Sequence, residues 1–575
     1  MTVAGWAEIV LFLVVLTALT PLIGGYMARV FTGERVFLTP VLAPVERLAF
    51  RAFGVRPERG QDWKSYARSV LLFSALSWGL LYLILRTQTL HPLNPLDLSS
   101  GTWDNSFSVA SSFISNTNWQ FYGGETTMTY VSQMAGLAVQ NFVSAAVGIA
   151  VLVALIRGLI SRSGHELGNF WSDLTRTLLY VLLPISIVGA LVLNSQGVIQ
   201  SLGDYVPLTT VTGLDQTLPL GPVAGQEVIK ELGTNGGGFF NVNSAMPFEN
   251  PTWFSNFFEM LLILIIPAGL TATFGRMVGS RRQGWAIFAA MMVMFIVAVS
   301  VIYVAESGPT AAMDSAGING PNLEGKEQRF GIASSSLFTA VTTAASCGAV
   351  NNAHESLTAL GGAVPLGQMM TGEVIFGGVG SGLYAMLLFV ILGVFISGLM
   401  VGRTPEYLGK KIESREVRLT IIGTIGVPLI VLFTTALATA SKYGKASIYD
   451  SGPQGFSETL YAYVSQGNNN GSAFAGYTAY TQVDANNDVV TVTFSQILGG
   501  LSMLGGRFLP LLAVLAIAGS LAGKKVAPLG AGTLRTDTPT FVVVLIGVIL
   551  LIALLTFVPA LLLGPVVQGL TDQLF

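Results

Sequence analysis

Four short clusters of Asn, Thr, Ser and Gly recur along the chain at intervals of about 110–125 residues. Glycine lets the backbone adopt conformations that other residues resist, so carbonyl oxygens can turn toward a common axis. A ring of such oxygens can replace the hydration shell of a cation. The clusters therefore predict an ion filter. Its twelve candidate residues are Asn116, Thr117, Asn118, Thr234, Asn235, Gly236, Ser346, Cys347, Gly348, Asn469, Asn470 and Gly471.

The four triplets contain no formal charge, which limits the ions that they suit. Ca²⁺ and Mg²⁺ take carboxylate ligands, whereas rings of carbonyl oxygens suit a weakly hydrated monovalent cation. Cys347 is the one cysteine of the chain and lies inside the third triplet. Because it has no His or acidic cluster beside it in the sequence, we interpret it as a small filter residue and not as a nucleophile.

Each triplet follows a moderately apolar stretch of two to four helical turns and lies between two strongly apolar segments. One such segment could be an ordinary loop, rich in Asn and Gly because loops are. Four at a matched long period instead predict four copies of one unit. The predicted unit is a membrane span, a loop that re-enters the membrane, and a second span.

The composition requires a membrane protein. Of the 575 residues, 51% are hydrophobic and only 10% charged, against about 25% charged in a typical soluble domain. These values exclude an ordinary soluble domain and a disordered chain. A net charge of −2 argues against a nucleic-acid partner, and one Cys with three His leaves little for disulfides or a metal site.

Ten segments are long and apolar enough to span the membrane as helices. We expect the first to be a retained helix and not a cleaved signal, because its basic flank follows it. The ten lie near residues 5–28, 69–88, 128–156, 177–195, 253–275, 285–305, 369–402, 419–440, 496–523 and 540–564.

Loop charge predicts the topology. The loops after the odd-numbered spans hold 22 Lys and Arg, whereas those after the even-numbered spans, which carry the triplets, hold 5. Since basic loops stay in the cytoplasm, we expect the triplets and both termini outside.

The predicted fold is an all-α polytopic membrane protein with four pseudo-repeated helix–pore loop–helix units around one pore and one extra helix at each end. The expected divisions are 1–60 (first helix and cytoplasmic loop), 61–160, 161–280, 281–410 and 411–530 (pore units 1 to 4), and 531–575 (last helix).

The strings SNTNWQFYGGE, TNGGGFFNVNSAMPFENP, SCGAVNNAHES and QGNNNGSAF resemble, in order, the filter motifs of the potassium-binding A subunit family of the Kdp potassium-importing ATPase (KdpA). The resemblance covers essentially the whole chain. It implies membership of a superfamily of potassium transporters, potassium binding at the four triplets, and a place in the bacterial inner membrane.

The chain lacks the motifs of an ATP-hydrolysing subunit: neither a phosphate-binding GxxxxGK[ST] loop nor the DKTGT of P-type ATPases occurs. We therefore expect a non-catalytic transport subunit without a cofactor. The resemblance implies partners that supply the energy, namely a P-type ATPase subunit (KdpB) that uses the ATP, with KdpC and KdpF. The alternative is a self-sufficient potassium channel or ion-coupled transporter. A membrane enzyme would need clustered acidic or His residues, and these are scattered.

Glycine is unusually dense in the seventh span, at 372–382. A close-packed small-residue face would explain this, but so would a broken helix, and the resemblance favours a break beneath the third filter loop that acts as a gate. The gate candidates there are Gly377, Gly378 and Gly380. Span nine has a weaker version at 498–510.

Charges within spans are functional candidates. Arg507 interrupts span nine. Arg403 ends span seven and is either a cytoplasmic anchor or, as the resemblance implies, a charge that discourages leak. Glu373 is expected near the outer interface, and Glu259 is ambiguous.

Overall fold

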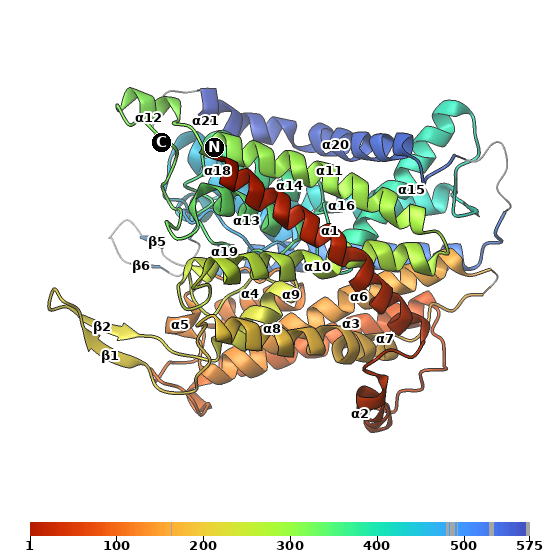
Figure 1. Ribbon diagram of the computed structural model, residues 1–575, viewed down its shortest axis with the longest axis horizontal. Helices are drawn as coiled ribbons and strands as arrows, with labels where there is room; N and C mark the ends of the chain where they lie inside the picture. The colour runs from red at the N-terminus through yellow and green to blue at the C-terminus, as the bar shows by residue number, and fades with distance from the viewer. Residues whose placement is uncertain (163, 479–481, 484–488, 491–492, 528–533, 571–575) are drawn as a thin grey trace.

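The computed structural model describes residues 1–162, 164–478, 482–483, 489–490, 493–527 and 534–570. Its long helices lie side by side across the molecule (Figure 1). Ten are long and apolar enough to cross a membrane, which confirms the predicted spans. They are α1 (Val3–Thr32), α3 (Trp63–Arg86), η2 with α6 (Ser132–Ile160), α7 to α8 (Phe170–Ser195), α10 (Trp253–Met277), α11 (Arg281–Glu306), α15 (Ser381–Val401), α16 (Ser414–Ala440), α19 (Thr493–Ala522) and α20 to α21 (Pro539–Leu570).

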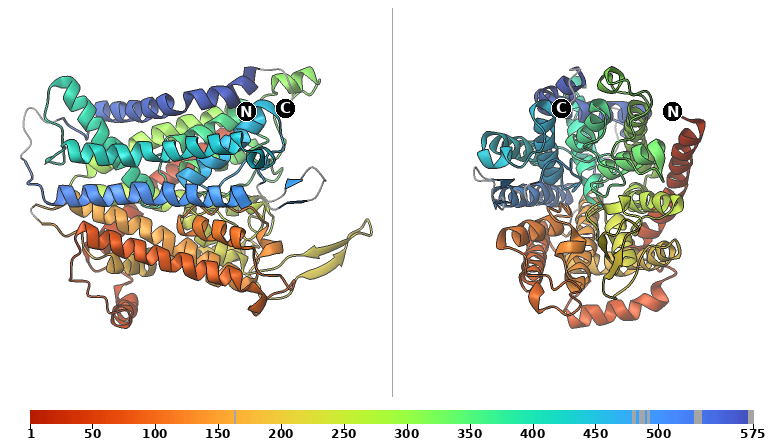
Figure 2. Two further views of the ribbon diagram at one scale, coloured as in Figure 1. Left: turned by 180° about the vertical axis from the view of Figure 1, so that it is seen from behind. Right: turned by 90° about the vertical axis from the view of Figure 1, so that its left-hand side faces the viewer.

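Four shorter helices lie between pairs of spans, and each ends at one of the clusters. They are α4 (Trp103–Ile114), α9 (Val223–Leu232), α13 (Gly331–Ala344) and α18 (Gly452–Asn468). Seen from the end that carries both termini, the successive span–short helix–span units occupy successive sectors (Figure 2). We call these four the pore helices and this end of the bundle the filter end.

The remaining elements are short and peripheral, and the sequence analysis did not predict them. They are α2 (Thr39–Ala52), α5 (Gly124–Thr127), α12 (Ala311–Ser315), α17 (Lys442–Lys445), and the antiparallel hairpins β1–β2 (Val206–Thr209, Asp215–Leu218), β3–β4 (Glu406–Tyr407, Lys410–Lys411) and β5–β6 (Gln482–Val483, Val489–Val490). The β1–β2 hairpin projects from the filter end (Figure 1).

The seventh span is interrupted. Helix α14 (Ala359–Met370) ends ten residues before α15 begins, and residues 371–380 form a non-helical linker. The break predicted from the glycines is confirmed, whereas a span beginning at residue 369 is wrong. The membrane-crossing helix itself begins at Ser381, directly after Gly380, whose φ of 81° is poorly tolerated by other residues.

The break suggested for the ninth span is wrong, because α19 is continuous from Thr493 to Ala522. Its glycines serve close packing. A Cβ at Gly506 would overlap the carbonyl oxygen of Gly467 on α18, and one at Gly500 would strike the ring of Phe107 on α4. Tertiary packing thus overrides the helix-weakening effect of glycine.

The helix ends follow local sequence signals. The Thr252 hydroxyl accepts from the backbone N–H of Ser255 at 3.0 Å, and the Ser255 hydroxyl accepts from that of Thr252, so the two cap the start of α10. The C-terminal end of α15 is capped by Gly402, which adopts φ 68°. Such caps satisfy backbone groups that have no partner within the helix.

The proposed division into units stays a prediction. Residues 528–530 at the end of unit 4, and 531–533 and 571–575 of the last division, lie outside the described residues.

One buried ion pair fixes three helices at the end opposite the filter. Arg157 on α6 meets Asp173 on α7 through two contacts of 2.6 and 2.8 Å, and the hydroxyl of Tyr66 on α3 donates to the same carboxylate at 3.0 Å. We predict that Asp173→Ala destabilises the fold by about 3 kcal/mol, because the half-buried Arg157 guanidinium loses its carboxylate and the buried Tyr66 hydroxyl loses that acceptor. Asp537→Ala, which breaks the exposed pair with Arg535, is the control. Thermal unfolding of the purified chain should show a lower midpoint for the first variant alone, and equal midpoints would contradict the prediction.

Candidate functional site

The four pore helices end where the chain turns into the predicted triplets. The backbone at their C-terminal ends carries carbonyl groups without helical partners, and each end is partially negative. Two of the helices stop at a residue that no longer fits a helix, since Asn469 ends α18 in the left-handed region and Ala345 ends α13. Four negative helix ends thus approach one site.

All four triplets share one backbone pattern. In each, the first and third residues have positive φ, and the residue between them does not. For residues other than glycine the left-handed conformation costs about 1–2 kcal/mol, so a pattern kept four times must be held by its surroundings. Alternation of this kind turns successive carbonyls to the same side of the chain. The left-handed residues are Asn116, Asn118, Thr234, Gly236, Ser346, Gly348, Asn469 and Gly471.

The triplets pack against one another in a closed ring. A Cβ at Gly236 would overlap the carbonyl oxygen of Cys347, one at Gly348 that of Asn470, and one at Gly471 that of Thr117. The second, third, fourth and first loops therefore touch in that order.

Hydrogen bonds close the ring between the first and second loops and strengthen the other joints. The Asn116 amide donates to the carbonyl oxygen of Thr234 at 2.9 Å, and the Asn235 amide donates to Asn116 Oδ1 at 2.6 Å. The Asn469 amide donates to Thr117 Oγ1 at 2.9 Å, and the Ser346 hydroxyl to the carbonyl oxygen of Asn469 at 3.0 Å. The sequence prediction that the four clusters meet is thus matched by their contacts.

Side chains behind the ring hold it in place. Thr342 accepts from the N–H of Gly348 at 2.9 Å, and Ser465 accepts from the N–H of Gly471 at 3.0 Å. The Asn118 amide donates to Asn141 on α6 at 2.6 Å. These three bonds use N–H groups and side chains and no carbonyl oxygen of the triplets, whereas the carbonyl oxygens of Thr234 and Asn469 accept bonds within the ring.

A buried charge cluster, which sequence reasoning missed, braces the second loop. Lys230 on α9 contacts Glu227 at 2.8 Å and Glu249 at 2.9 Å, with Glu231 at 3.6 Å. The Cys347 thiol donates to Glu231 at 3.2 Å. The sequence analysis counted Lys230 only as a loop charge. The spacing of Glu227, Lys230 and Glu231, three and four residues apart, places them on one face of a helix and could have predicted the contact. Three acidic side chains thus surround one buried lysine beside the ring.

Two cavities flank the ring. The cavity on the filter end, here called the vestibule, has a volume of about 690 Å³ and is lined by the third residue of every triplet. The smaller inner cavity, of about 70 Å³, is lined by the first residues of the third and fourth triplets, Ser346 and Asn469. The triplets therefore stand between the two spaces.

The linker of residues 371–380 forms part of the inner cavity wall. Gly377 N–H donates to the carbonyl oxygen of Ala344 at 2.8 Å, and Val379 N–H donates to Thr234 Oγ1 at 3.1 Å. A Cβ at Gly380 would overlap the backbone of Gly148 on α6. Gly378 lines the cavity and lies near Ser346 and Thr234 of the third and second loops. Gly377 thus contacts the end of α13, and Gly380 contacts α6, so only part of the linker lies against the filter loops.

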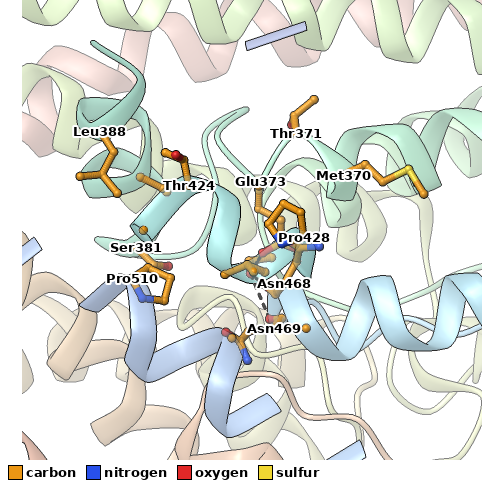
Figure 3. Close-up of a pocket in the computed structure, with 18 of the residues that line it drawn as sticks. Met370, Thr371, Glu373, Ser381, Leu388, Thr424, Pro428, Asn468, Asn469 and Pro510 are labelled. Carbon is orange, nitrogen blue, oxygen red and sulfur yellow. Dashed lines mark hydrogen bonds between the residues drawn. The ribbon is translucent and has the colours of Figure 1, made fainter. Parts of the chain in front are cut away.

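Glu373 does not lie at the outer interface, as expected from its place in the sequence. It is buried in the inner cavity and accepts a hydrogen bond from the Ser346 hydroxyl. Figure 3 shows Glu373 on the linker, in the cavity that Pro428 of α16 and Asn469 also line. Residues 371–380 are not helical, and this places Glu373 below the ring. A prediction of membrane spans does not locate such a break to a particular residue.

The two arginines singled out from the sequence lie in different places. Arg507 is buried in the inner cavity wall, where it donates to the carbonyl oxygen of Ser144 at 3.2 Å. Arg403 is exposed, directly after the end of α15. The structure therefore brings Arg507 to the linker and the ring, but not Arg403.

Comparisons with known proteins agree with this architecture. The fold is similar to the crystal structure of the potassium transporter TrkH from Vibrio parahaemolyticus, with a TM-score of 0.50 at 13% identity over 88% of this chain and 96% of that one. At this identity the likeness concerns the fold alone.

Full-length relatives are much closer in sequence. Proteins named potassium-transporting ATPase potassium-binding subunit are 55% identical in Methylobacterium nodulans (99% of this chain, 98% of that protein) and 55% identical in Methylorubrum extorquens (100% and 99%). One from Granulibacter bethesdensis is 53% identical over 99% of each. The family model described as potassium-transporting ATPase A subunit, KdpA, matches residues 10–570. The chain therefore belongs to the KdpA family.

Proposed function

We propose that this chain selects potassium at the ring of four triplets and passes it to an ATP-driven partner. The observation that carries the proposal is the repeated left-handed pattern at the first and third residue of every triplet, in a ring between two cavities. The relatives named as potassium-binding subunits support the choice of ion.

The chemistry of the ring favours potassium. Uncharged carbonyl oxygens can replace the loosely held water of K⁺. Divalent ions, which hold water more tightly and take carboxylates, gain less there. The partially negative ends of the pore helices add a favourable potential without putting a charge in the ring.

The relatives are subunits of a potassium-transporting ATPase, and membership of the family implies ATPase partners for this chain. Because the sequence has neither GxxxxGK[ST] nor DKTGT, we propose that a P-type ATPase subunit (KdpB) hydrolyses ATP and that KdpC and KdpF complete the complex.

The inner cavity supports transfer to the side of the bundle. It extends from Ser346 to Thr424 and Pro428 on α16 and to Thr556 and Phe557 on α20. Helix α20 is largely exposed on the periphery of the bundle. An ion that leaves the ring would therefore move sideways toward a neighbouring subunit.

The alternative is a self-sufficient potassium channel or ion-coupled transporter. It needs a continuous route along the pore axis to the far end. The linker of residues 371–380 packs against the ring, and the Arg507 guanidinium lines the space beneath. Both oppose passage of a cation in that direction, which favours a pump subunit.

We further propose that the filter end and both termini face outward from the bacterial inner membrane. The excess of Lys and Arg in the loops at the opposite end supports this orientation.

Replacing Gly236 tests the ring. We predict that Gly236→Ser weakens apparent potassium affinity at least tenfold and relaxes discrimination against rubidium, because Gly236 has φ 78° and its Cβ would overlap the carbonyl of Cys347. Gly225→Ser is the matched control. It lies on α9, the pore helix that leads into the loop of Gly236, and its Cβ would come no closer than 3.8 Å to a neighbour. Potassium-stimulated ATPase activity of the whole complex is the measurement, and unchanged affinity in Gly236→Ser would contradict the assignment.

The two arginines form a matched pair for the gate. We predict that Arg507→Gln raises passive rubidium flux into vesicles without ATP, since it removes the positive charge from the inner cavity. Arg403→Gln removes an exposed charge outside that cavity and should leave flux and affinity unchanged. Equal passive rubidium flux in both variants would contradict the assignment of Arg507 to the gate.

A further inference from the structure

Helix α2 (Thr39–Ala52) lies outside the bundle of spans and runs across their direction. Figure 1 shows it end-on beneath the bundle, toward the end opposite the filter, and the end view of Figure 2 shows it lengthwise at the lower edge. None of its residues is fully buried. A helix in this position lies along a membrane surface and does not cross the membrane.

One face of α2 is docked onto the bundle. The Glu46 carboxylate pairs with the Arg176 guanidinium at 2.7 Å and accepts a hydrogen bond from the Tyr180 hydroxyl at 2.9 Å. Leu38 and Leu42 pack against a small apolar cluster that includes Tyr180. The orientation of the helix is therefore fixed, and the protein covers only part of its surface.

A second face of α2 is apolar and uncovered. Val41, Val45 and Leu48 are 70%, 46% and 68% exposed, and their spacing of four and three residues puts them in one stripe along the helix. Phe37 and Phe53, which are 78% and 81% exposed, lie just beyond its two ends. Apolar side chains gathered in this way are costly in water, so the stripe calls for an apolar cover.

Arginines lie beside the stripe. At about 100° per residue, Arg47 and Arg51 lie next to it on the side opposite Leu42. Residues 35–59 contain five arginines and only two acids, and among the described residues none of these arginines forms an ion pair. The five are Arg35, Arg47, Arg51, Arg56 and Arg59. Their charges are therefore available to an anionic partner.

A basic cavity follows the C-terminal end of α2. It has a volume of about 560 Å³, and its described lining includes Phe53, Arg56, Arg59 and Trp171 and no acid. The side-chain amide of Asn169, which also lines it, donates to the carbonyl oxygens of Arg56 at 3.3 Å and Arg59 at 3.0 Å. The backbone that carries both guanidinium groups is thus held in place, at the start of α7.

We propose that α2 and this cavity bind an anionic phospholipid of the membrane, with its phosphate at Arg56 and Arg59 and its acyl chains along the apolar stripe. Arginine donates pairs of hydrogen bonds to phosphate oxygens, and basic pockets at a membrane surface hold anionic headgroups. Phe53 is exposed and lines the cavity, so it joins the two parts. A free phosphate would leave the stripe uncovered.

The lipid site lies away from the transport route. Helices α2 and α20 are on opposite sides of the bundle in both views (Figures 1 and 2), and the inner cavity leads to α20. The lipid would hold α2 at the membrane surface and take no part in selecting the ion. Only the choice of the cytoplasmic leaflet rests on the proposed orientation, so the lipid site and the proposed function fail independently.

Native mass spectrometry tests the headgroup site, with the full chain released from micelles that hold equal amounts of phosphatidylglycerol and phosphatidylcholine. We expect at least fivefold more phosphatidylglycerol to remain bound. The double variant Arg56→Gln, Arg59→Gln should lose this preference, whereas Arg418→Gln, which replaces an exposed arginine of α16, should keep it. Unfolding midpoints without lipid should be equal in all three chains, because no described ion pair is lost.

Equal retention of the two lipids by the unaltered chain would overturn the proposal, as would a preference that survives the double variant. Displacement of phosphatidylglycerol by a large excess of inorganic phosphate would assign the cavity to free anions and overturn it equally.

A fluorescent label tests the apolar stripe separately. Val41→Cys would carry a nitrobenzoxadiazole label in nanodiscs of the same two lipids, and Cys347 is fully buried and stays unlabelled. Doxyl-labelled lipid should quench this label at least threefold more strongly than one at Val211→Cys, in the exposed turn of the β1–β2 hairpin. Equal quenching, with the label at residue 41 open to iodide, would place the stripe in water and overturn the proposal.

Discussion

The structure depends on one constraint: non-helical backbone among membrane-spanning helices must be buried in protein that satisfies its polar groups, or must line a water-filled path. The four triplets meet this constraint together and not singly. Each triplet packs against the next loop, as the close contacts of Gly236, Gly348 and Gly471 with neighbouring backbone show. Each also depends on side chains behind it, such as Thr342 and Ser465. A fourfold repeat of span, pore helix and span provides that shell on every side.

The same constraint explains the buried polar residues of the interior. Serine, threonine and asparagine are costly in an apolar bundle unless they are paired. Here they lie where the loops need donors and acceptors, as Asn118 and Asn141 do. The lysine on α9 and its carboxylates follow the same rule, because the ammonium group is fully enclosed by acids. Buried polar side chains therefore gather around the triplets, within a bundle whose core is otherwise largely apolar.

Sequence reasoning succeeded where the signal is local. Span length predicted ten helices, the density of Asn and Gly predicted four clusters, and the glycines of span seven, together with the family resemblance, predicted its interruption. It failed where tertiary contacts decide. The glycines of span nine looked like those of span seven, yet they fit α19 against Gly467 and Phe107 and leave it intact. Glu373 was placed at an interface because nothing in the sequence shows that the linker folds back under the ring.

The four units are not identical, and the third unit differs from the others on the inner side of the ring. Only the third unit has a linker of residues 371–380 in place of a continuous second helix among the described elements, and the inner cavity extends from there between α15, α16 and α20. A symmetric channel would open along its axis. This arrangement instead joins the ring to the side of the bundle, where a second protein can receive the ion.

Rubidium-86 uptake into vesicles tests this account most directly. The chain would be reconstituted alone and then with its ATPase partners, with and without ATP, under an imposed membrane potential. The account predicts negligible uptake by the chain alone and ATP-dependent uptake only in the full complex. Rapid uptake by the chain alone that follows the membrane potential would contradict it, because the ion would then have a direct route past the linker and Arg507.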